Sequence, residues 1–472
     1  MHPALGLPEV VGLVLDLFDP VDEKPSLSPL YNSLFVNKLF NHEATRIMWS
    51  ANFDSDRAYL LNNLARKDVA RAQFYANFIR VMEIYPRNGE NVTELCHLAY
   101  PRLQKVLVYE YSHIEYPPHA YADEICKHLA QPSLLHYELH EGPAITDDVL
   151  AALTQHCPKL QSLRLKSSGH DSATAEGLVY LISALHYIHS FIFQGAFAGI
   201  LTSKSFQAFA QHPRLKSLAL PLIEDDWLHA LQELDRTGAV FPELIELRTQ
   251  ISCSGLELLL RYAPKLEILI IYPQVVATHS LLAVASGFVN LVELHVEFSP
   301  GSTINGTDLI NLTRSCPKLV SLVVGGVGDS KPSVKNLTDD TIVEMARLLP
   351  DLTAFHLICE PRDILSWSAL RALGEHCLKL ERCCLSGAID WKIAVANDAM
   401  FPSLTRLTVM HASKNTTSLE EMDGLAGKLA NMMPQLRFFD GPAHSVVDHE
   451  LAVRLDPLLQ QRLQADGESK SY

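Results

Sequence analysis

The sequence is short of positive charge. Its 472 residues include 39 Lys and Arg against 54 Asp and Glu, which gives a formal net charge of −15 at pH 7. Binding to nucleic acid or to an anionic membrane surface needs clustered Lys and Arg, and the sequence contains no basic run. We therefore expect neither nucleic acid nor a membrane as a partner.

Long apolar runs are missing too. A membrane-spanning helix needs roughly 20 apolar residues, and no stretch approaches that length. The opening residues MHPALGLPEV have no basic segment ahead of an apolar one, so we expect no secretory signal. The nine cysteines are odd in number and lack CxxC spacing, which is typical of reduced thiols. We therefore expect a cytoplasmic or nuclear protein.

Motifs that hold phosphate or carry out hydrolysis are also absent. The sequence contains no GxxxxGK[ST], GxGxxG, GxSxG or HExxH. The glycine turn GGVG at 325–328 lacks the lysine that a phosphate-binding loop needs. We expect no cofactor, no metal and no enzymatic activity.

One phrase recurs through most of the chain. CPKLQSLRL at 157–165 returns as CPKLVSLVV at 316–324, and the looser pattern LxxLxL occurs fourteen times. The phrases start at residues 79, 103, 134, 160, 188, 215, 244, 266, 291, 319, 352, 380, 404 and 436.

LxxLxL is the strand signature of a leucine-rich repeat, in which each unit adds a short parallel strand and a returning helix. The sequence predicts an α/β fold: a leucine-rich-repeat solenoid forming an open arc, with parallel strands on the concave face and helices outside. Segments such as 145–158 and 336–350 predict the helices, each stopped by a proline. Segments 111–121 and 325–339 are predicted insertions.

The two ends of the chain do not carry the repeat. Residues 7–18 are apolar on nearly all sides, and segments 28–40 and 42–49 predict two further short helices. Such a thin bundle either caps the solenoid or is covered by a second protein. The predicted domains are 1–50 (helical bundle), 51–78 (linker and first helix of the solenoid), 79–455 (13 to 14 repeats) and 456–472 (flexible tail).

The first fifty residues resemble an F-box. LPEVVGLVLDLFDP and LYNSLFVNKLFNHEATRIMW follow its pattern of an LPxE start, a leucine-rich second helix and a closing Trp. Leu7, Pro8 and Glu9 are assigned to the LPxE start, and Trp49 is assigned to the closing Trp of the F-box pattern. The second helix is matched by Leu34, Val36, Asn37 and Lys38. Residues 71–84 also resemble the lead-in to the repeats of fungal F-box proteins with leucine-rich repeats.

The resemblance implies a function. Members of this family are substrate receptors of SCF-type cullin–RING ubiquitin ligases, in which the F-box binds a Skp-family adaptor and the repeats bind the target protein. The residues that would contact the adaptor are Leu7, Pro8, Glu9, Val10, Val14, Leu34 and Val36. The alternative is a leucine-rich-repeat binding scaffold whose bundle is only a cap and which has no ligase role.

The strand residues between the apolar positions would line the concave face, because side chains alternate along a strand. Tyr and Arg are frequent anchors of protein interfaces. The candidate contacts to an unknown protein substrate are Tyr109, His136, Arg164, Lys166, Arg248, Tyr272, His295, Arg382 and Arg406.

Two patterns raise a third possibility, an enzyme. His136, Glu138 and His140 form an HxExH strand, but a third ligand at i+4 lies about 13 Å from the first, too far for one metal ion. Cys157 and Cys316 end repeat helices, as Cys377 does, at a position that sister repeats fill with Phe, Ala or Leu. We therefore interpret these cysteines as packing residues.

Overall fold

The computed structural model describes residues 7–17, 29–50, 55–85, 92–109, 121–140, 145–167, 172–195, 199–235, 240–273, 281–298, 301–326, 331–360, 364–387, 389, 391, 401–409, 419–440 and 446–465. The chain divides into two compact units. Unit 1 holds residues 1–221 and 230–243, and unit 2 holds residues 222–229 and 244–472. No helix in the described ranges has the length and apolar character to cross a membrane.

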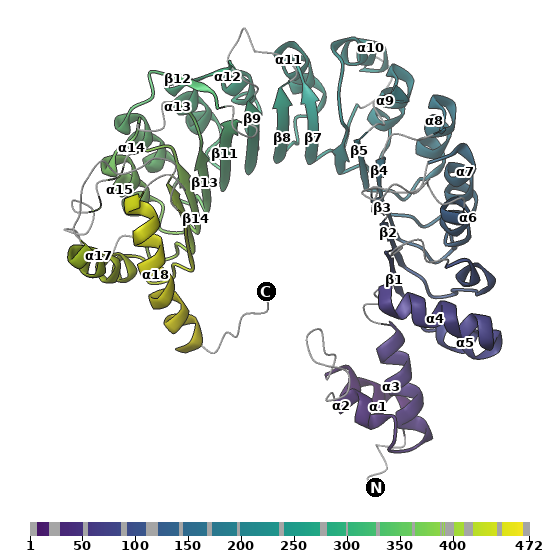
Figure 1. Ribbon diagram of the computed structural model, residues 1–472. Helices are drawn as coiled ribbons and strands as arrows, with labels where there is room; N and C mark the ends of the chain where they lie inside the picture. Colours follow the sequence, from purple (N-terminus) through teal and green to yellow (C-terminus); the bar gives the residue numbers. More distant parts are fainter. Residues whose placement is uncertain are drawn as a thin grey trace. The chain divides into compact units, whose positions relative to one another are not determined.

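Unit 1 starts with helices and continues with alternating strands and helices (Figure 1). The leading helices are α1 (Pro8–Asp16), α2 (Pro29–Ser33), α3 (Lys38–Ser50), α4 (Ser55–Lys67) and α5 (Val69–Ala76). The repeats follow as β1 (Val81–Ile84), η3 (Thr93–His97), β2 (Lys105–Tyr109), α6 (Tyr121–His128), β3 (His136–His140), α7 (Asp147–His156), β4 (Ser162–Ser167), α8 (Ala175–Ala184), β5 (Ser190–Gly195), α9 (Ser203–Ala210) and β6 (Ser217–Ala219). Helix α10 (Asp225–Asp235) contributes residues to both units.

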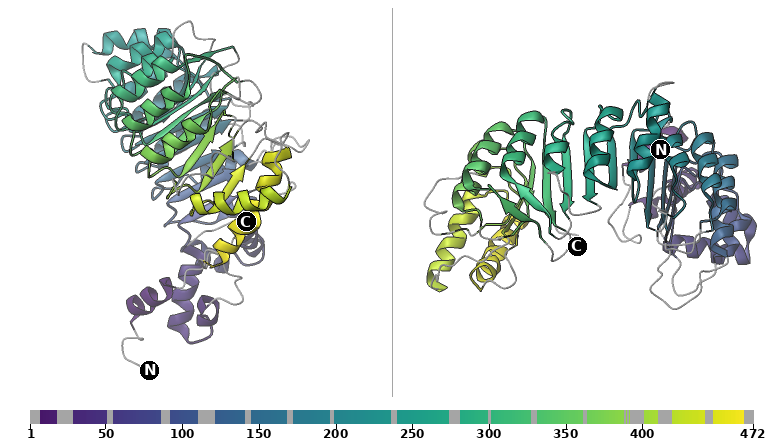
Figure 2. Two further views of the ribbon diagram at one scale, coloured as in Figure 1. Left: turned by 90° about the vertical axis from the view of Figure 1, so that its left-hand side faces the viewer. Right: turned by 90° about the horizontal axis from the view of Figure 1, so that it is seen from above.

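Unit 2 continues the alternation, with helices α11 to α15 in a row on one side of its strands (Figure 2). Its first elements are β7 (Glu246–Ile251), α11 (Cys253–Tyr262), β8 (Ile268–Pro273), α12 (Leu281–Ala285), β9 (Glu293–Phe298), β10 (Thr303–Asn305), α13 (Gly306–Ser315) and β11 (Ser321–Gly326). The remainder are β12 (Ser333–Lys335), α14 (Asp339–Leu348), β13 (Ala354–Leu357), α15 (Trp367–His376), β14 (Arg382–Leu385), β15 (Arg406–Val409), α17 (Leu419–Met432), β16 (Phe438–Asp440) and α18 (Val446–Ala465).

Every LxxLxL phrase forms a strand at its end, which confirms the predicted leucine-rich-repeat fold. Strand order follows sequence order, β1 to β6 in unit 1 and β7-β8-β9-β11-β13-β14-β15-β16 in unit 2. The pairings are parallel, and equivalent positions of successive phrases are opposite each other, as Leu163 is to Tyr137 and to Phe191. These three side chains are fully buried. Each phrase therefore supplies one layer of a continuous apolar core.

The repeat helices begin and end as their sequences predict. Thr146 accepts a hydrogen bond from the backbone N–H of Val149 and caps α7, and Cys157 ends that helix. Cys316 and Cys377 end their helices in the same way, and each thiol donates to a carbonyl of the preceding repeat, at 3.3 Å from Phe288 O and from Leu349 O. The cysteines are therefore part of the packing between repeats.

Aspartates at the start of repeat helices join one repeat to the next. The Asp147 and Asp339 carboxylates accept the backbone N–H of a capping residue at 2.8 Å, and the Asp225 carboxylate accepts a capping hydroxyl at 2.6 Å. In all three pairs the two residues are 27 positions apart. The pairs are Asp147–Thr174, Asp225–Ser252 and Asp339–Ser366. Each carboxylate thus holds the cap of the following helix in place.

Asp225→Ala is expected to lower the stability of unit 2 by about 1.5–3 kcal/mol, because a hydrogen bond to a charged group contributes roughly that much. The carboxylate accepts from the hydroxyls of Ser252 and Ser254, both at 2.6 Å, and Ser252 in turn caps α11. Urea unfolding followed by circular dichroism measures the change. An unchanged midpoint would show that this bridge does not stabilise the repeats.

The predicted second helix is wrong over much of its length. Segment 28–40 was expected to be one helix, but α2 ends at Ser33, and residues 38–40 belong to α3. The break has a local cause: the Asn37 side chain accepts the backbone N–H groups of Leu39 and Phe40 at 2.9 and 3.0 Å and so starts a new helix. The third predicted helix, 42–49, lies inside α3.

The predicted C-terminal tail also needs correction. The tail was expected to be flexible from residue 456, but α18 continues to Ala465 through Pro457. Leu451, Leu455 and Leu459 lie on one side of this helix and are buried, so packing offsets the helix-breaking effect of the proline. The predicted insertion at 325–339 contains strand β12, which pairs with β10. The predicted insertion at 111–121 lies outside the described residues except for Tyr121.

Candidate functional site

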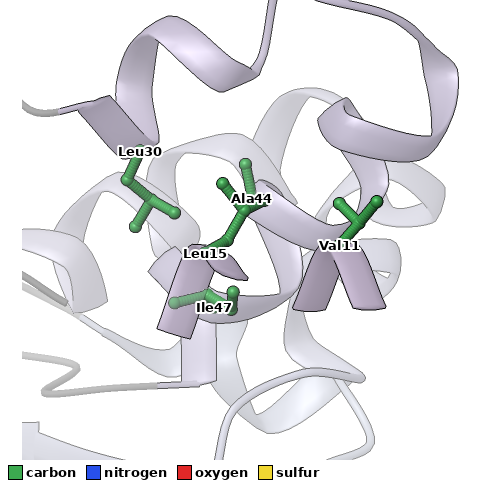
Figure 3. Packing of buried hydrophobic residues seen from close by; sticks show 5 residues of the cluster. All are labelled: Val11, Leu15, Leu30, Ala44 and Ile47. Atoms are coloured by element: carbon green, nitrogen blue, oxygen red, sulfur yellow. The ribbon is translucent and has the colours of Figure 1, made fainter. Parts of the chain in front are cut away.

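The N-terminal bundle, formed by α1 to α3, has a small core of its own. Val11, Leu15, Leu30, Ala44 and Ile47 are buried together (Figure 3). Half-buried side chains of Leu34, Leu39, Phe40 and Met48 pack around them. Five buried side chains are few for an independent domain, so this bundle has little apolar surface to spare.

Helix α1 nevertheless carries a second apolar side. Val10, Leu13, Val14 and Leu17 follow the i, i+3, i+4, i+7 spacing of one helix face, separate from the face of Val11 and Leu15 that meets the core. Leu13 is 70% exposed and Leu17 is 83% exposed. An amphipathic surface helix normally directs polar residues outward, so this face is available to a partner.

The turn after α2 adds aromatic and aliphatic surface. Phe35 is 73% exposed, and Val36 beside it is also exposed. The rings of Tyr31 and Phe35 pack edge to face with centroids 5.5 Å apart. We define the bundle face as the exposed side chains Leu7, Leu13, Val14, Leu17, Tyr31, Phe35 and Val36.

The residues predicted to contact an adaptor have different surroundings in the structure. Leu7, Pro8, Glu9, Val14 and Val36 are exposed, Val10 is half-buried, and Leu34 packs against the bundle core. Sequence reasoning missed Leu13, Leu17, Tyr31 and Phe35. Their exposure depends on which side of α1 meets α3 and on the break at residues 34–36, and the sequence pattern gives neither.

A buried carboxylate of α3 lies where that helix packs against α1. Glu43 is largely buried, and its carboxylate accepts from Arg46 Nε at 2.7 Å and lies 3.1 Å from His42 Nδ1. Gly12 allows the close approach, because a Cβ there would be 3.2 Å from both Glu43 Oε2 and Arg46 Nη2. Burial by itself raises the pKa of Glu43, but the hydrogen bonds and positive charges of Arg46 and His42 together hold it below its ordinary value.

Acid is therefore expected to destabilise the bundle. A carboxyl with a lower pKa in the folded than in the unfolded state stabilises the fold above the unfolded value of about 4.3, and the contribution is lost as pH falls through the folded value. Thermal unfolding at pH 7 and near pH 4 should show a larger loss for the wild type than for Glu43→Gln. Equal losses in the two proteins would contradict this assignment.

Helix α3 also fastens the bundle to the first repeats. It contacts α1 and α2 and, in addition, α5. Trp49 stacks on Tyr75 of α5 with ring centroids 4.5 Å apart, and His42 meets Phe78 edge to face at 5.5 Å. Arg57 donates to the Met48 carbonyl at 2.8 Å. The bundle thus caps the start of the repeats through α3 and leaves the bundle face uncovered.

The strand side chains between the buried positions form the open sheet face of each unit. In unit 1 this face is centred on Glu138, whose carboxylate is 3.1 Å from Lys105 Nζ and 3.4 Å from Arg164 Nη1 on the two neighbouring strands. His140 Nε2 lies 3.1 Å from the same carboxylate. Burial lowers the pKa of the neighbouring His136, with a further contribution from the charge of Lys105.

Three aromatic rings stack along the same face. Tyr85 and Tyr109 are parallel with centroids 4.1 Å apart, and Tyr109 and His140 are parallel at 4.5 Å. The register explains the stack, because Tyr109 and His140 are opposite each other on β2 and β3. Lys166 is half-buried on β4. Of the predicted contact residues in this unit, Tyr109, His136, Arg164 and Lys166 therefore lie on adjacent strands.

In unit 2 the predicted residues fall into two sets. Arg248, Tyr272 and His295 lie on the adjacent strands β7, β8 and β9, and His295 Nε2 is 3.1 Å from Glu297. Arg382 and Arg406 are opposite each other on β14 and β15. Sequence reasoning gave the individual residues but not these groupings, because unequal repeat lengths hide the register.

The cysteines and the HxExH strand offer little for catalysis. Burial raises the pKa of Cys157 and Cys377 to about 12 and that of Cys316 to about 11, which disfavours the nucleophilic thiolate. Glu138 is already engaged by the side chains of Lys105 and Arg164. In the described ranges, no three His, Cys, Asp or Glu side chains are grouped as a metal site requires.

Comparison with known proteins adds distant structural similarity. No model of a protein family matches the chain, and no curated protein sequence matches it. A chain of the Rad7–Elc1 complex from yeast is 15% identical, with 86% of this chain and 90% of that chain covered and a TM-score of 0.36. The leucine-rich-repeat protein LegL7 from Legionella pneumophila is 13% identical over 80% and 98% of the two chains, with a TM-score of 0.31.

A chain of the Toll–Spatzle complex from Drosophila is 14% identical, with 82% of this chain and 46% of that chain covered and a TM-score of 0.34. Similarities this distant carry no argument about function. The fold assignment rests instead on the repeated phrase, the parallel register and the buried layers. On that basis the chain is a leucine-rich-repeat solenoid with a helical bundle at its start.

Proposed function

We propose that this protein is the substrate-recognition subunit of an SCF-type cullin–RING ubiquitin ligase. In this proposal the bundle face binds a Skp-family adaptor, and the open sheet face of the repeats binds a target protein. The observation that carries the proposal is the bundle face itself: a bundle with a core of five side chains leaves seven large apolar side chains exposed.

Leaving these apolar side chains exposed to water is unfavourable for a protein that acts alone. Burying a Leu or Phe side chain contributes about 1.5–3 kcal/mol, and the bundle forgoes this gain at several positions. Several large apolar side chains exposed on one small bundle are typical of a protein interaction site. A partner that covers the bundle face would recover the missing stabilisation.

The F-box resemblance supplies the identity of that partner. Leu7 and Pro8, which match the first two positions of the family's LPxE start, and Glu9, which stands one position earlier than the Glu of that motif, are exposed at the start of α1. Val36, which matches the second-helix motif, is exposed immediately before the Asn37 cap. These residues border the bundle face, which supports their assignment to adaptor binding.

The rest of the proposal concerns the repeats. Their open sheet face carries Tyr, Arg and His side chains at successive strands, which suits recognition of a protein surface. We assign the chain no catalytic step of its own, because ubiquitin transfer would be carried out by the ligase that it joins. The proposal places the protein in the cytoplasm or nucleus.

The test is reconstitution with purified components. The full chain is mixed with a Skp-family adaptor and then with a cullin–RING module, and complex formation is followed by size-exclusion chromatography. We expect the chain and the adaptor to co-elute in equimolar amounts and to recruit the cullin. If the folded chain fails to bind the adaptor at micromolar concentration, the result would favour the alternative function, a leucine-rich-repeat binding scaffold whose bundle is only a cap. The contact of Trp49 with Tyr75 is also compatible with that alternative.

A further inference from the structure

Two arginines in unit 2 are placed where a sheet normally avoids like charges. Arg382 and Arg406 are directly opposite each other on the parallel strands β14 and β15, and both are exposed on the open sheet face. Neighbouring strands are about 4.8 Å apart, and like charges at opposite positions are destabilising. The fold therefore maintains an unfavourable juxtaposition here.

Neither arginine has a carboxylate partner among the residues that the structure describes. Asp440 on β16 is opposite Thr408 and not opposite Arg406. Unit 1 shows the usual arrangement, in which Glu138 lies between the side chains of Lys105 and Arg164 on adjacent strands. In a chain with a net charge of −15, two opposed strand arginines without an ion-paired carboxylate among the described residues are unusual.

An aromatic ring on the next strand engages one of the two guanidinium groups. The Arg406 guanidinium lies over the ring of Phe438, 4.7 Å from its centroid. Phe438 belongs to β16, which is on the far side of β15 from β14. Arg406 is therefore drawn away from Arg382, and a cation–π contact leaves the N–H edges of its guanidinium available to a ligand.

A third polar group completes the surface. His356 lies on β13, next to β14, and is opposite Cys384. Burial lowers the pKa of His356, and the positive charges of Arg382, His295 and Arg406 lower it further. The imidazole is therefore mostly neutral at pH 7, so the positive charge of this surface comes mainly from the two arginines, while the charges of Lys331 and Asp440 act on the neighbouring Cys384.

We propose that Arg382 and Arg406 bind an extended acidic segment of a partner protein, with one carboxylate on each guanidinium. Carboxylates two residues apart on an extended chain are about 6.8 Å from each other, a spacing that arginines on neighbouring strands can span. Each arginine can hold a planar carboxylate through two parallel hydrogen bonds. The seat of Arg406 on Phe438, on the side away from β14, favours two separate carboxylates over one phosphate, which would need both guanidinium groups to converge.

This inference deepens the proposed function, since it rests on that function for the idea that the acidic segment belongs to a ubiquitination substrate. The binding itself does not require an adaptor.

The test is a binding assay with labelled peptides. Purified full-length chain is titrated into a fluorescein-labelled peptide of alternating Glu and Thr, and fluorescence anisotropy is measured. Matched peptides carry Gln, or phosphoserine, in place of Glu. The protein variants are Arg382→Gln, Arg406→Gln and the double variant.

Arg371→Gln is the control, because Arg371 is an exposed arginine of the same unit that is paired with Glu375 on α15. We expect the Glu peptide to bind the wild type and Arg371→Gln equally, and the double variant about tenfold or more weakly. Added salt should weaken binding. Because the substitutions remove a like-charge pair, the thermal midpoint should stay the same or rise, so lost binding would not reflect lost folding.

Three results would overturn the inference: no binding of the Glu peptide at millimolar concentration, equal binding of the Gln peptide, or equal binding by the double variant. Much tighter binding of the phosphoserine peptide would overturn the choice of carboxylate. None of these results affects adaptor binding by the bundle. Failure here and failure of the ligase proposal are therefore distinguishable.

Discussion

Replacing Leu13 and Phe35 together with serine is expected to abolish recovery of a Skp-family adaptor while the repeats stay folded. Both side chains are mostly exposed in the free chain, so they contribute little to its folding. If the adaptor buries them, each contributes about 1.5–3 kcal/mol to binding. The double variant should then bind roughly a hundredfold or more weakly, as isothermal titration calorimetry would measure.

The control for this experiment is Tyr180→Ser on α8. Tyr180 is also a large exposed side chain in unit 1, but it belongs to a repeat helix and not to the bundle face. Its replacement should leave adaptor binding unchanged. If Leu13→Ser with Phe35→Ser also leaves binding unchanged, the bundle face is not the adaptor site. If the control loses binding too, the recovery is nonspecific.

Gly306→Ala is expected to cause the largest loss of stability, about 3 kcal/mol in unit 2. A Cβ on Gly306 would be 2.0 Å from the backbone carbonyl oxygen of Asn336. The two residues directly follow β10 and β12, whose pairing ends at Asn305 and Lys335, so the contact continues the register of two hydrogen-bonded strands. The carbonyl cannot move without disrupting that pairing.

The backbone of Asn336 adds to the rigidity of this contact. Its φ of 54° lies in the left-handed region, which Asn tolerates better than most residues, so the turn has few alternative conformations. Gly424→Ala in α17 is the control, since a Cβ there meets nothing within 4 Å. That substitution should be neutral or stabilising, by up to about 1 kcal/mol, because alanine favours a helix interior. Calorimetric unfolding of both variants decides the comparison.

The sequence predicted the repeats because their packing problem is local and recurs. Each phrase places its own apolar residues in one layer, so the pattern is visible without knowledge of the neighbouring layers. The same logic identified the cysteines at helix ends as packing residues. By contrast, the break after Ser33 depends on one side chain, Asn37, which offers the backbone an alternative to a continuous helix.

Features that involve two or more repeats could not be predicted from the sequence. The Tyr85–Tyr109–His140 stack needs the register between strands, which unequal repeat lengths conceal. The helix through Pro457 required knowledge that Leu455 and Leu459 are buried against other elements. The candidate residues were thus predicted as individuals, and their association came from the structure.

The way α3 holds the bundle has a mechanical consequence. A protein bound to α1 and α2 is connected to the repeats through α3 and its aromatic contact with α5. Under the proposed function, the packing of Trp49 on Tyr75 would set how a target protein on the repeats is oriented toward an adaptor on the bundle. A smaller side chain at Trp49 would then loosen that orientation, and we expect the choice of modified lysines on the target to broaden before target binding weakens.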